Sequence, residues 1–106
     1  MSLKWPPKDP DETLDYTVDW TRFLRAGETI SSVAWYINDA SGVKQAVTSG
    51  STVNAIAVAQ TGSTGTTATI YLSGGTNNTQ YTIFCAVTLS SGVVAERSIT
   101  LSIKER

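Results

Sequence analysis

The sequence contains no histidine and a single cysteine, Cys85, among its 106 residues. Catalytic devices that need an imidazole, zinc sites built from histidine or cysteine, and a disulfide within one chain are therefore excluded. No apolar run approaches the ~20 residues that a membrane-spanning helix needs. The apolar core of a secretory signal is also missing, because Trp5-Pro6-Pro7 interrupts the N-terminus. We expect neither a membrane association nor a secretory signal.

Charge is scarce and unevenly placed. Eight basic and nine acidic residues leave a formal net charge of −1, and no cluster of Lys and Arg suggests nucleic acid as a partner. Ten of the 17 charged residues lie in positions 1–28, and none lies between Gln45 and Ala95. Two interpretations of this neutral body remain open: its faces pack against other subunits, where charge is depleted, or Thr-rich strand faces are soluble enough alone.

Serine and threonine account for 28 of the 106 residues, which favours strands and turns. Apolar residues alternate with polar ones in seven segments, and this period of two predicts strands. The segments are 14–20, 33–37, 43–47, 54–60, 66–73, 81–89 and 98–104. Residues 61–65 are predicted to be a polar loop, and residues 21–26 are compatible with a single helical turn.

About seven strands with frequent turns and no long helix predict an all-β, immunoglobulin-like antiparallel β-sandwich with an extended N-terminal arm. We assign residues 1–13 to the arm and residues 14–106 to the sandwich domain. The predicted core is the set Val33, Trp35, Ile37, Ile70, Leu72, Tyr81, Ile83, Cys85, Val87, Ile99 and Leu101.

Two aromatic residues support this fold. Trp35 is in phase with the core of an early strand, where this architecture often buries a tryptophan. Tyr81 follows the Gly74-Gly75 turn and opens a long strand, where a tyrosine corner would hydrogen-bond back to the preceding loop. A role as plain core aromatics is the alternative, and both interpretations are structural.

The arm is the candidate protein-interaction site, formed by Trp5, Pro6, Pro7, Lys8, Asp9 and Pro10. Three prolines in five positions exclude a helix and favour an extended segment. We expect this segment to stand away from the sandwich, with Trp5 reserved for a neighbouring chain. Deletion of residues 1–10 should then leave the melting temperature nearly unchanged.

No motif indicates catalysis, a metal or a cofactor. The acidic residues Asp9, Asp11, Glu12, Asp15 and Asp19 lack the alternating ligands, central glycine and terminal glutamate of a calcium loop. A serine nucleophile needs a base, which without histidine could only be a lysine, and the glycine pairs lack the Gly-Lys-Ser/Thr of a phosphate loop. Cys85 is in phase with the core and is expected to be an inert thiol. We expect a protein that is not an enzyme and binds no cofactor.

Two parts of the chain carry a family resemblance. The more specific part is Lys4-Trp5-Pro6-Pro7-Lys8-Asp9-Pro10-Asp11-Glu12, which continues through Leu14-Asp15-Tyr16, Asp19-Trp20 and Gly27-Glu28-Thr29-Ile30. The second part comprises Thr69-Ile70-Tyr71-Leu72-Ser73-Gly74-Gly75-Thr76, Tyr81-Thr82, Gly92, Glu96-Arg97-Ser98-Ile99 and Glu105-Arg106. Together they resemble the phage fiber-tail adaptor protein family, small virion proteins of tailed phages and prophages. Residues 39–60 do not take part in the resemblance.

The resemblance implies a non-enzymatic structural component of a phage or prophage particle, an adaptor in the tail, neck or fibre region. It also implies synthesis in the bacterial cytoplasm, a place in the virion in multiple copies, and other virion or tail proteins as partners. The alternative is an immunoglobulin-like adhesion or glycan-binding module. Such a module would use the loops at 38–42, 61–65 or 76–78, with Trp5, Tyr36 or Tyr71 as a platform for sugars.

Overall fold

The computed structural model describes residues 2–105, which form strands, turns and loops and contain no helix that could span a membrane. The strands in this part of the chain are β1 (Ser2–Lys4), β2 (Thr13–Asp19), β3 (Ile30–Asn38), β4 (Lys44–Val47), β5 (Thr52–Val53), β6 (Ile56–Ser63), β7 (Thr67–Gly74), β8 (Thr79–Leu89) and β9 (Val94–Ile103). The protein is all-β, as the alternating pattern predicts.

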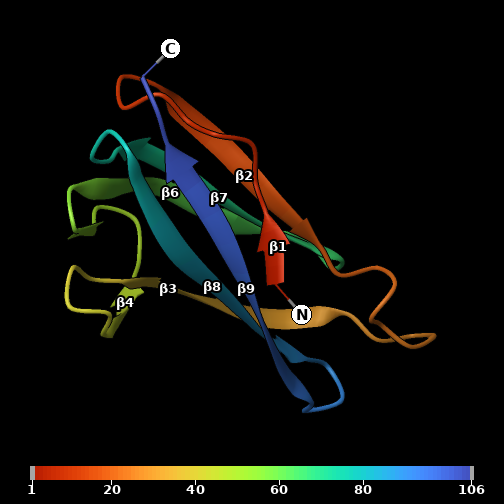
Figure 1. Cartoon of the computed structure of the whole chain (residues 1–106). Coiled ribbons are helices and arrows are strands. Elements are labelled where there is room, and N and C mark those ends of the chain that lie inside the picture. The colour runs from red at the N-terminus through yellow and green to blue at the C-terminus, as the bar shows by residue number, and fades with distance from the viewer. Residues whose placement is uncertain (1, 106) are drawn as a thin grey trace.

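The strands form two sheets that pack face to face (Figure 1). One sheet has the order β1-β9-β8-β3-β4, and the other has the order β2-β7-β6-β5. All neighbours are antiparallel except β1, which runs parallel to β9. The prediction of an immunoglobulin-like sandwich is confirmed. In the terms of that fold, β2, β7 and β6 are strands B, E and D, while β3, β8 and β9 are C, F and G.

The core lies between the sheets and consists of the in-phase residues of the long strands. Along β8 every second side chain from Tyr81 to Leu89 is buried, because the side chains of a strand alternate between its two faces. Ten of the eleven predicted core residues are buried, and Val33 is half-buried against the same cluster. Tyr16, Val18 and Trp20 from β2 and its end complete the opposite wall.

Some predicted boundaries were wrong. Strand β6 runs through Ser63, so most of the predicted loop at 61–65 is paired with β7. Residues 54 and 55 are a turn instead, since Asn54 and Ala55 have φ values of 50° and 70°. Residues 21–26, by contrast, agree with the expected single turn, since the amides of Phe23 and Leu24 both donate to the carbonyl of Trp20. Polar composition does not mark a loop where threonine itself favours a strand.

The tyrosine corner is present. The Tyr81 hydroxyl donates to the Asn54 carbonyl at 2.6 Å and accepts from the Thr76 amide at 2.9 Å, which confirms the predicted bond to the preceding loop. Gly74, the last residue of β7, has a φ of +75°, and a Cβ at that position would lie 2.8 Å from the Ala55 carbonyl oxygen. Only glycine fits this corner without strain.

Trp35 provides a test of the core. It is 3% exposed, and its indole nitrogen has no hydrogen-bond partner within residues 2–105, so it contributes by packing alone. Trp35→Ala should lower the free energy of unfolding by about 3–5 kcal/mol in urea denaturation. A variant with the stability of the wild type would show that this strand has another register.

Candidate functional site

The N-terminal arm is paired with the sandwich along strand β9. Strand β1 matches Leu3 to Ile99, and the ladder continues past it. The Trp5 amide donates to the Thr100 carbonyl at 3.0 Å, and the Lys8 amide donates to the Ser102 carbonyl at 2.9 Å. The arm thus supplies β1, the edge strand of the five-stranded sheet, beside β9 (Figure 1).

Trp5 belongs to the protein's own core. Its side chain is 9% exposed and stacks on Tyr16 of β2, with ring centroids 4.4 Å apart and planes inclined by 17°. The expectation that the arm stands away from the sandwich, with Trp5 reserved for a neighbour, is therefore wrong. The Trp5 ring fills the gap between the two sheets at the strand edge. The free energy gained by burying this ring outweighs the conformational entropy that the arm loses when it is ordered against the sandwich. As a sugar platform Trp5 is unavailable.

Lys8 is the buried charged residue of the described chain. Its side chain is 0% exposed, and its ammonium donates to the carbonyls of Asp9 and Gly74, both at 2.8 Å. Burial lowers the pKa of Lys8 below its usual 10.5, while the carboxylates of Glu12, Asp9 and Asp11 oppose that shift. Lysine is rarely buried, so nothing in the sequence pattern pointed to this position.

The remaining candidate residues of the arm face outward to different degrees. Pro6 and Pro7 are exposed, while Asp9 and Pro10 are half-buried. Asp9 organises the turn that leads into β2: its carboxylate accepts from the Asp11 amide, and its carbonyl accepts from the Glu12 amide. Of the six predicted contact residues, Trp5 and Lys8 anchor the arm, and the prolines form its outer surface.

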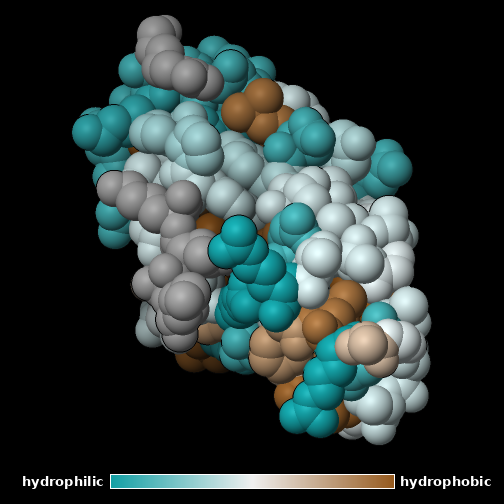
Figure 2. All heavy atoms as spheres, turned by 90° about the vertical axis from the view of Figure 1, so that its right-hand side faces the viewer, coloured by the Kyte–Doolittle hydropathy of each residue, from teal (hydrophilic) through white to brown (hydrophobic). Residues whose placement is uncertain are grey.

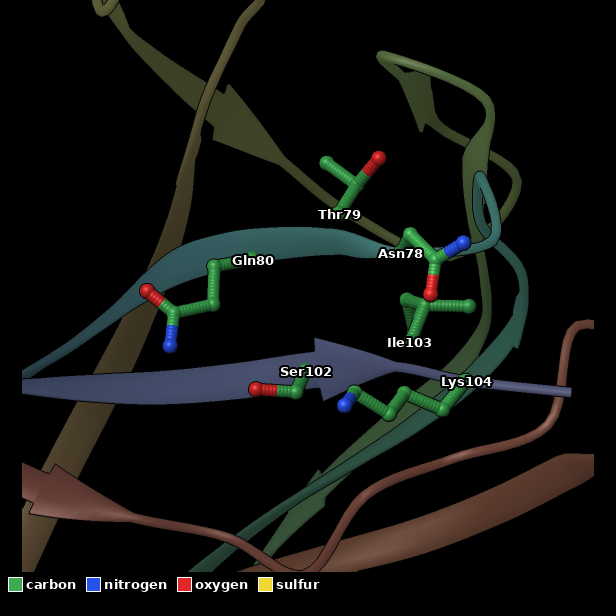
Figure 3. A pocket seen from close by; sticks show the side chains of 6 residues that line it. All are labelled: Asn78, Thr79, Gln80, Ser102, Ile103 and Lys104. Carbon is green, nitrogen blue, oxygen red and sulfur yellow. The ribbon is translucent and has the colours of Figure 1, made fainter.

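An open hollow of about 370 Å³ lies where β8 begins and β9 ends. It is lined by Asn78, Thr79, Gln80, Ser102, Ile103 and Lys104. Figure 3 shows Gln80 and Ser102 side by side on the two strands, with Lys104 beyond them. Its lining includes neither a carboxylate nor an aromatic ring, so it offers hydrogen bonds but no acid–base pair and no platform for a sugar.

Exposed apolar side chains gather at the opposite end of the sandwich. Phe23 and Val93, 41% and 43% exposed, line a small pocket of about 110 Å³ together with Arg25, Glu28 and Leu89. The neighbouring Val94 is 67% exposed. Figure 2 shows several brown, apolar side chains at the lower end of the molecule and one smaller brown group near its top, with teal and pale side chains over most of the rest of that view. We call Phe23, Val93 and Val94 the apolar end.

The outer face of the five-stranded sheet is partly covered by one lysine. The Lys44 ammonium lies 4.6 Å from the ring centroid of Tyr36 and 4.5 Å from that of Phe84. It also forms a 2.6 Å ion pair with Glu96. Tyr36 is therefore engaged within the chain by a cation–π contact.

Cys85 and the carboxylates are the remaining candidates for reactive or metal-binding groups. Burial raises the pKa of the Cys85 thiol to about 11, and its side chain is 0% exposed, which confirms the predicted core position. Within residues 2–105 no three carboxylates or thiols lie close enough together to hold a metal ion.

A family model described as "Podophage GP4 fiber-tail adaptor protein gp77" matches residues 8–102, which is most of the sequence. The chain belongs to this family. A comparison with curated proteins finds no match. The family membership makes the protein a structural component of a phage tail, places it in the virion and gives it other tail proteins as its partners. It also implies a role without catalysis.

The burial of Trp5 can be tested directly. Trp5→Ala should lower the free energy of unfolding by about 3 kcal/mol, because it removes a buried aromatic ring and its stack on Tyr16. Val94→Ala is the control, since that side chain is 67% exposed and its truncation should change stability by less than about 1 kcal/mol. For the same reason, deletion of residues 1–10 should lower the melting temperature. If Trp5→Ala melts like the control, the arm does not pack as described.

The burial of Lys8 should make the free energy of unfolding depend on pH. Folding lowers the pKa of Lys8 below its usual 10.5, so the Lys8 amine holds its proton more tightly in the unfolded chain than in the folded one. The difference appears at alkaline pH, as the pH approaches 10.5. The contribution of Lys8 to stability therefore rises with pH. Urea denaturation from pH 7 to pH 10 should show a wild-type advantage over Lys8→Met that grows with pH. The exposed Lys104→Met should show no such trend, and a flat difference for Lys8→Met would contradict its burial.

Proposed function

We propose that this protein is an adaptor that joins a tail protein to a fibre protein of a podophage particle, in several copies per particle. The observation that carries this proposal is the family match over residues 8–102. In this proposal residues 1–13 are the docking arm, and residues 14–106 are the body that holds it in place.

The distribution of surfaces supports this role, because an adaptor must contact two partners at once. The molecule is 42 Å long and 25 Å across, and its exposed features lie at separate places along it. The arm presents Pro6 and Pro7, with Asp9 and Pro10 beside them, along the β9 side. The apolar end, with Phe23 and Val93, lies where the loop after β2 meets the β8–β9 turn. Exposed large apolar side chains are typical of protein contacts.

The arm has the properties of a rigid docking strip. Its prolines hold the backbone extended, so little conformational entropy remains to be lost on binding. Trp5 and Lys8 anchor it to the body, which keeps the outward-facing prolines at a constant position. We assign the exposed part of the segment from Trp5 to Pro10 as one of the two contact surfaces.

Complementation of a phage or prophage that lacks this gene tests the proposal. Particles made without the protein should lack fibres in negative-stain micrographs and should not infect, and the wild-type protein supplied in trans should restore both. Pro7→Arg should lower incorporation about tenfold or more, the effect of losing roughly 1.4 kcal/mol of contact free energy. Thr48→Arg, on the exposed turn after β4, is the matched control and should be incorporated normally.

The outcomes separate the alternatives. Fibres and infectivity that persist without the protein would disprove the adaptor role. Particles with complete fibres that fail only to adsorb would favour the glycan-binding alternative. Incorporation of Pro7→Arg at the level of Thr48→Arg would place the contact outside the arm.

A further inference from the structure

Strand β2 is an open edge of the four-stranded sheet, and it differs from the other sheet edges of the described chain. Strand β5 has two residues, β4 has four and carries Lys44, and the arm presents prolines. These are devices that protect an edge against pairing with another chain. Strand β2 has seven residues in unbroken register with β7 and contains no proline, lysine or bulge.

The register shows which backbone groups this edge offers. The Trp20 amide donates to the Thr66 carbonyl at 2.8 Å, which directs the even-numbered residues of the strand toward β7. Antiparallel ladders alternate, so the odd-numbered residues point their amides and carbonyls away from β7. Thr17 and Thr69 fit this register, because their hydroxyls lie 2.9 Å apart, as expected for the close, non-bonded pairs. Thr13, Asp15 and Thr17 thus present amides and carbonyls that no other part of residues 2–105 binds.

The fold explains why this edge is open. In an immunoglobulin sandwich strand A pairs with strand B, which is the position of β2. Here the segment before β2 pairs with β9 instead, through Trp5 and Lys8. The place of strand A beside β2 is therefore unfilled by the described part of the chain.

The side chains beside the open edge specify the charge of an added strand. Asp15 and Asp19 are exposed on the outer face of β2, four residues apart. Asp19 accepts two hydrogen bonds from Thr21, whereas Asp15 has no hydrogen bond or ion pair within residues 2–105. In an added strand, the residues opposite these two would point to the same face, so lysine or arginine there would form cross-strand ion pairs. A second copy of β2 would bring aspartates together and is disfavoured.

We propose that a basic, extended segment of another tail protein adds to the sandwich as a strand beside β2. It would donate to and accept from the backbone of Thr13, Asp15 and Thr17. It would place lysine or arginine at two positions four residues apart, opposite Asp15 and Asp19. Its intervening residues are apolar, because they would face the half-buried Leu14 and the interior. This mode is β-strand addition, with the backbone supplying affinity and the charges supplying register. The identity of the partner class rests on the adaptor function proposed above.

The test uses the isolated, ¹⁵N-labelled full chain and a capped peptide, Thr-Val-Lys-Val-Thr-Val-Lys-Val-Thr, followed by NMR. The expected result is amide shift changes centred on Thr13–Asp19 of β2. Binding should be at least about tenfold tighter than for a twin peptide with glutamate at both lysine positions. Higher salt should weaken binding. Shift changes centred on β4, or equal affinities for the two peptides, would overturn the proposal.

Two variants and one control sharpen the test. Asp15→Lys should abolish the preference between the two peptides, because each of them then forms one attractive pair and one repulsive pair with Lys at position 15 and Asp19. Thr17→Pro removes an amide that points away from β7, so the domain should keep its shifts in β8 and β9 while losing peptide binding. Gln60→Lys adds a lysine to the exposed part of β6 in the same sheet and should bind like the wild type. Wild-type binding by Asp15→Lys or Thr17→Pro would overturn the proposal.

The two proposals fail separately. A peptide that binds as expected, together with phages that carry fibres without this protein, would remove the adaptor role and leave the strand site. Fibre loss in the phage together with an inert β2 edge would leave the adaptor role and remove the strand site.

Discussion

The buried Lys8 joins three parts of the molecule that are far apart in the sequence. Its ammonium donates to the Gly74 carbonyl at the end of β7, its amide donates to Ser102 in β9, and its carbonyl accepts from Lys104. A buried ammonium is stable only while its acceptors stay in place, because an unpaired buried charge costs several kcal/mol, roughly 3–5 when one partner of a pair is lost. The arm, the end of β9 and the glycine corner at Gly74 therefore hold one another in position.

This arrangement has consequences for the surfaces. Because the arm pairs with β9, Trp5 fills the gap next to Tyr16, and the prolines at Pro6 and Pro7 form the outer strip of that sheet edge. The same choice of partner strand leaves β2 without a neighbour on one side. One edge of the sandwich is thus closed by proline, and the other is open and bordered by aspartates. This asymmetry supports the proposed adaptor role, which requires two distinct contact surfaces.

The uncharged middle of the chain agrees with a protein that packs against other subunits in an assembly, because charge is depleted at interface cores. Residues 45–95 carry no charge, and their exposed positions are mainly threonine, serine and small residues. The exposed cation and anion of the large sheet, Lys44 and Glu96, neutralise each other in an ion pair. Charge that remains free, such as that of Asp15, is concentrated near the start of the chain. The charged features that could guide a partner are therefore confined to a small part of the surface.

The strands and the core were predictable because they depend on local pattern. Alternation with period two decides which face of a strand is buried, and that is why Trp35, Tyr81 and Cys85 were placed correctly. The position of the arm was not predictable, because its proline content specifies an extended backbone but not the strand that the backbone joins. Trp5 and Lys8 are held by Tyr16, Gly74 and the carbonyls of β9, and these contacts exist only after residues up to 95 positions apart, as Trp5 and Thr100 are, have folded together. The sequence alone thus determined an all-β, charge-poor sandwich. Tertiary structure decided which edge the arm covers and which edge it leaves open, since edge pairing is a long-range competition between strands.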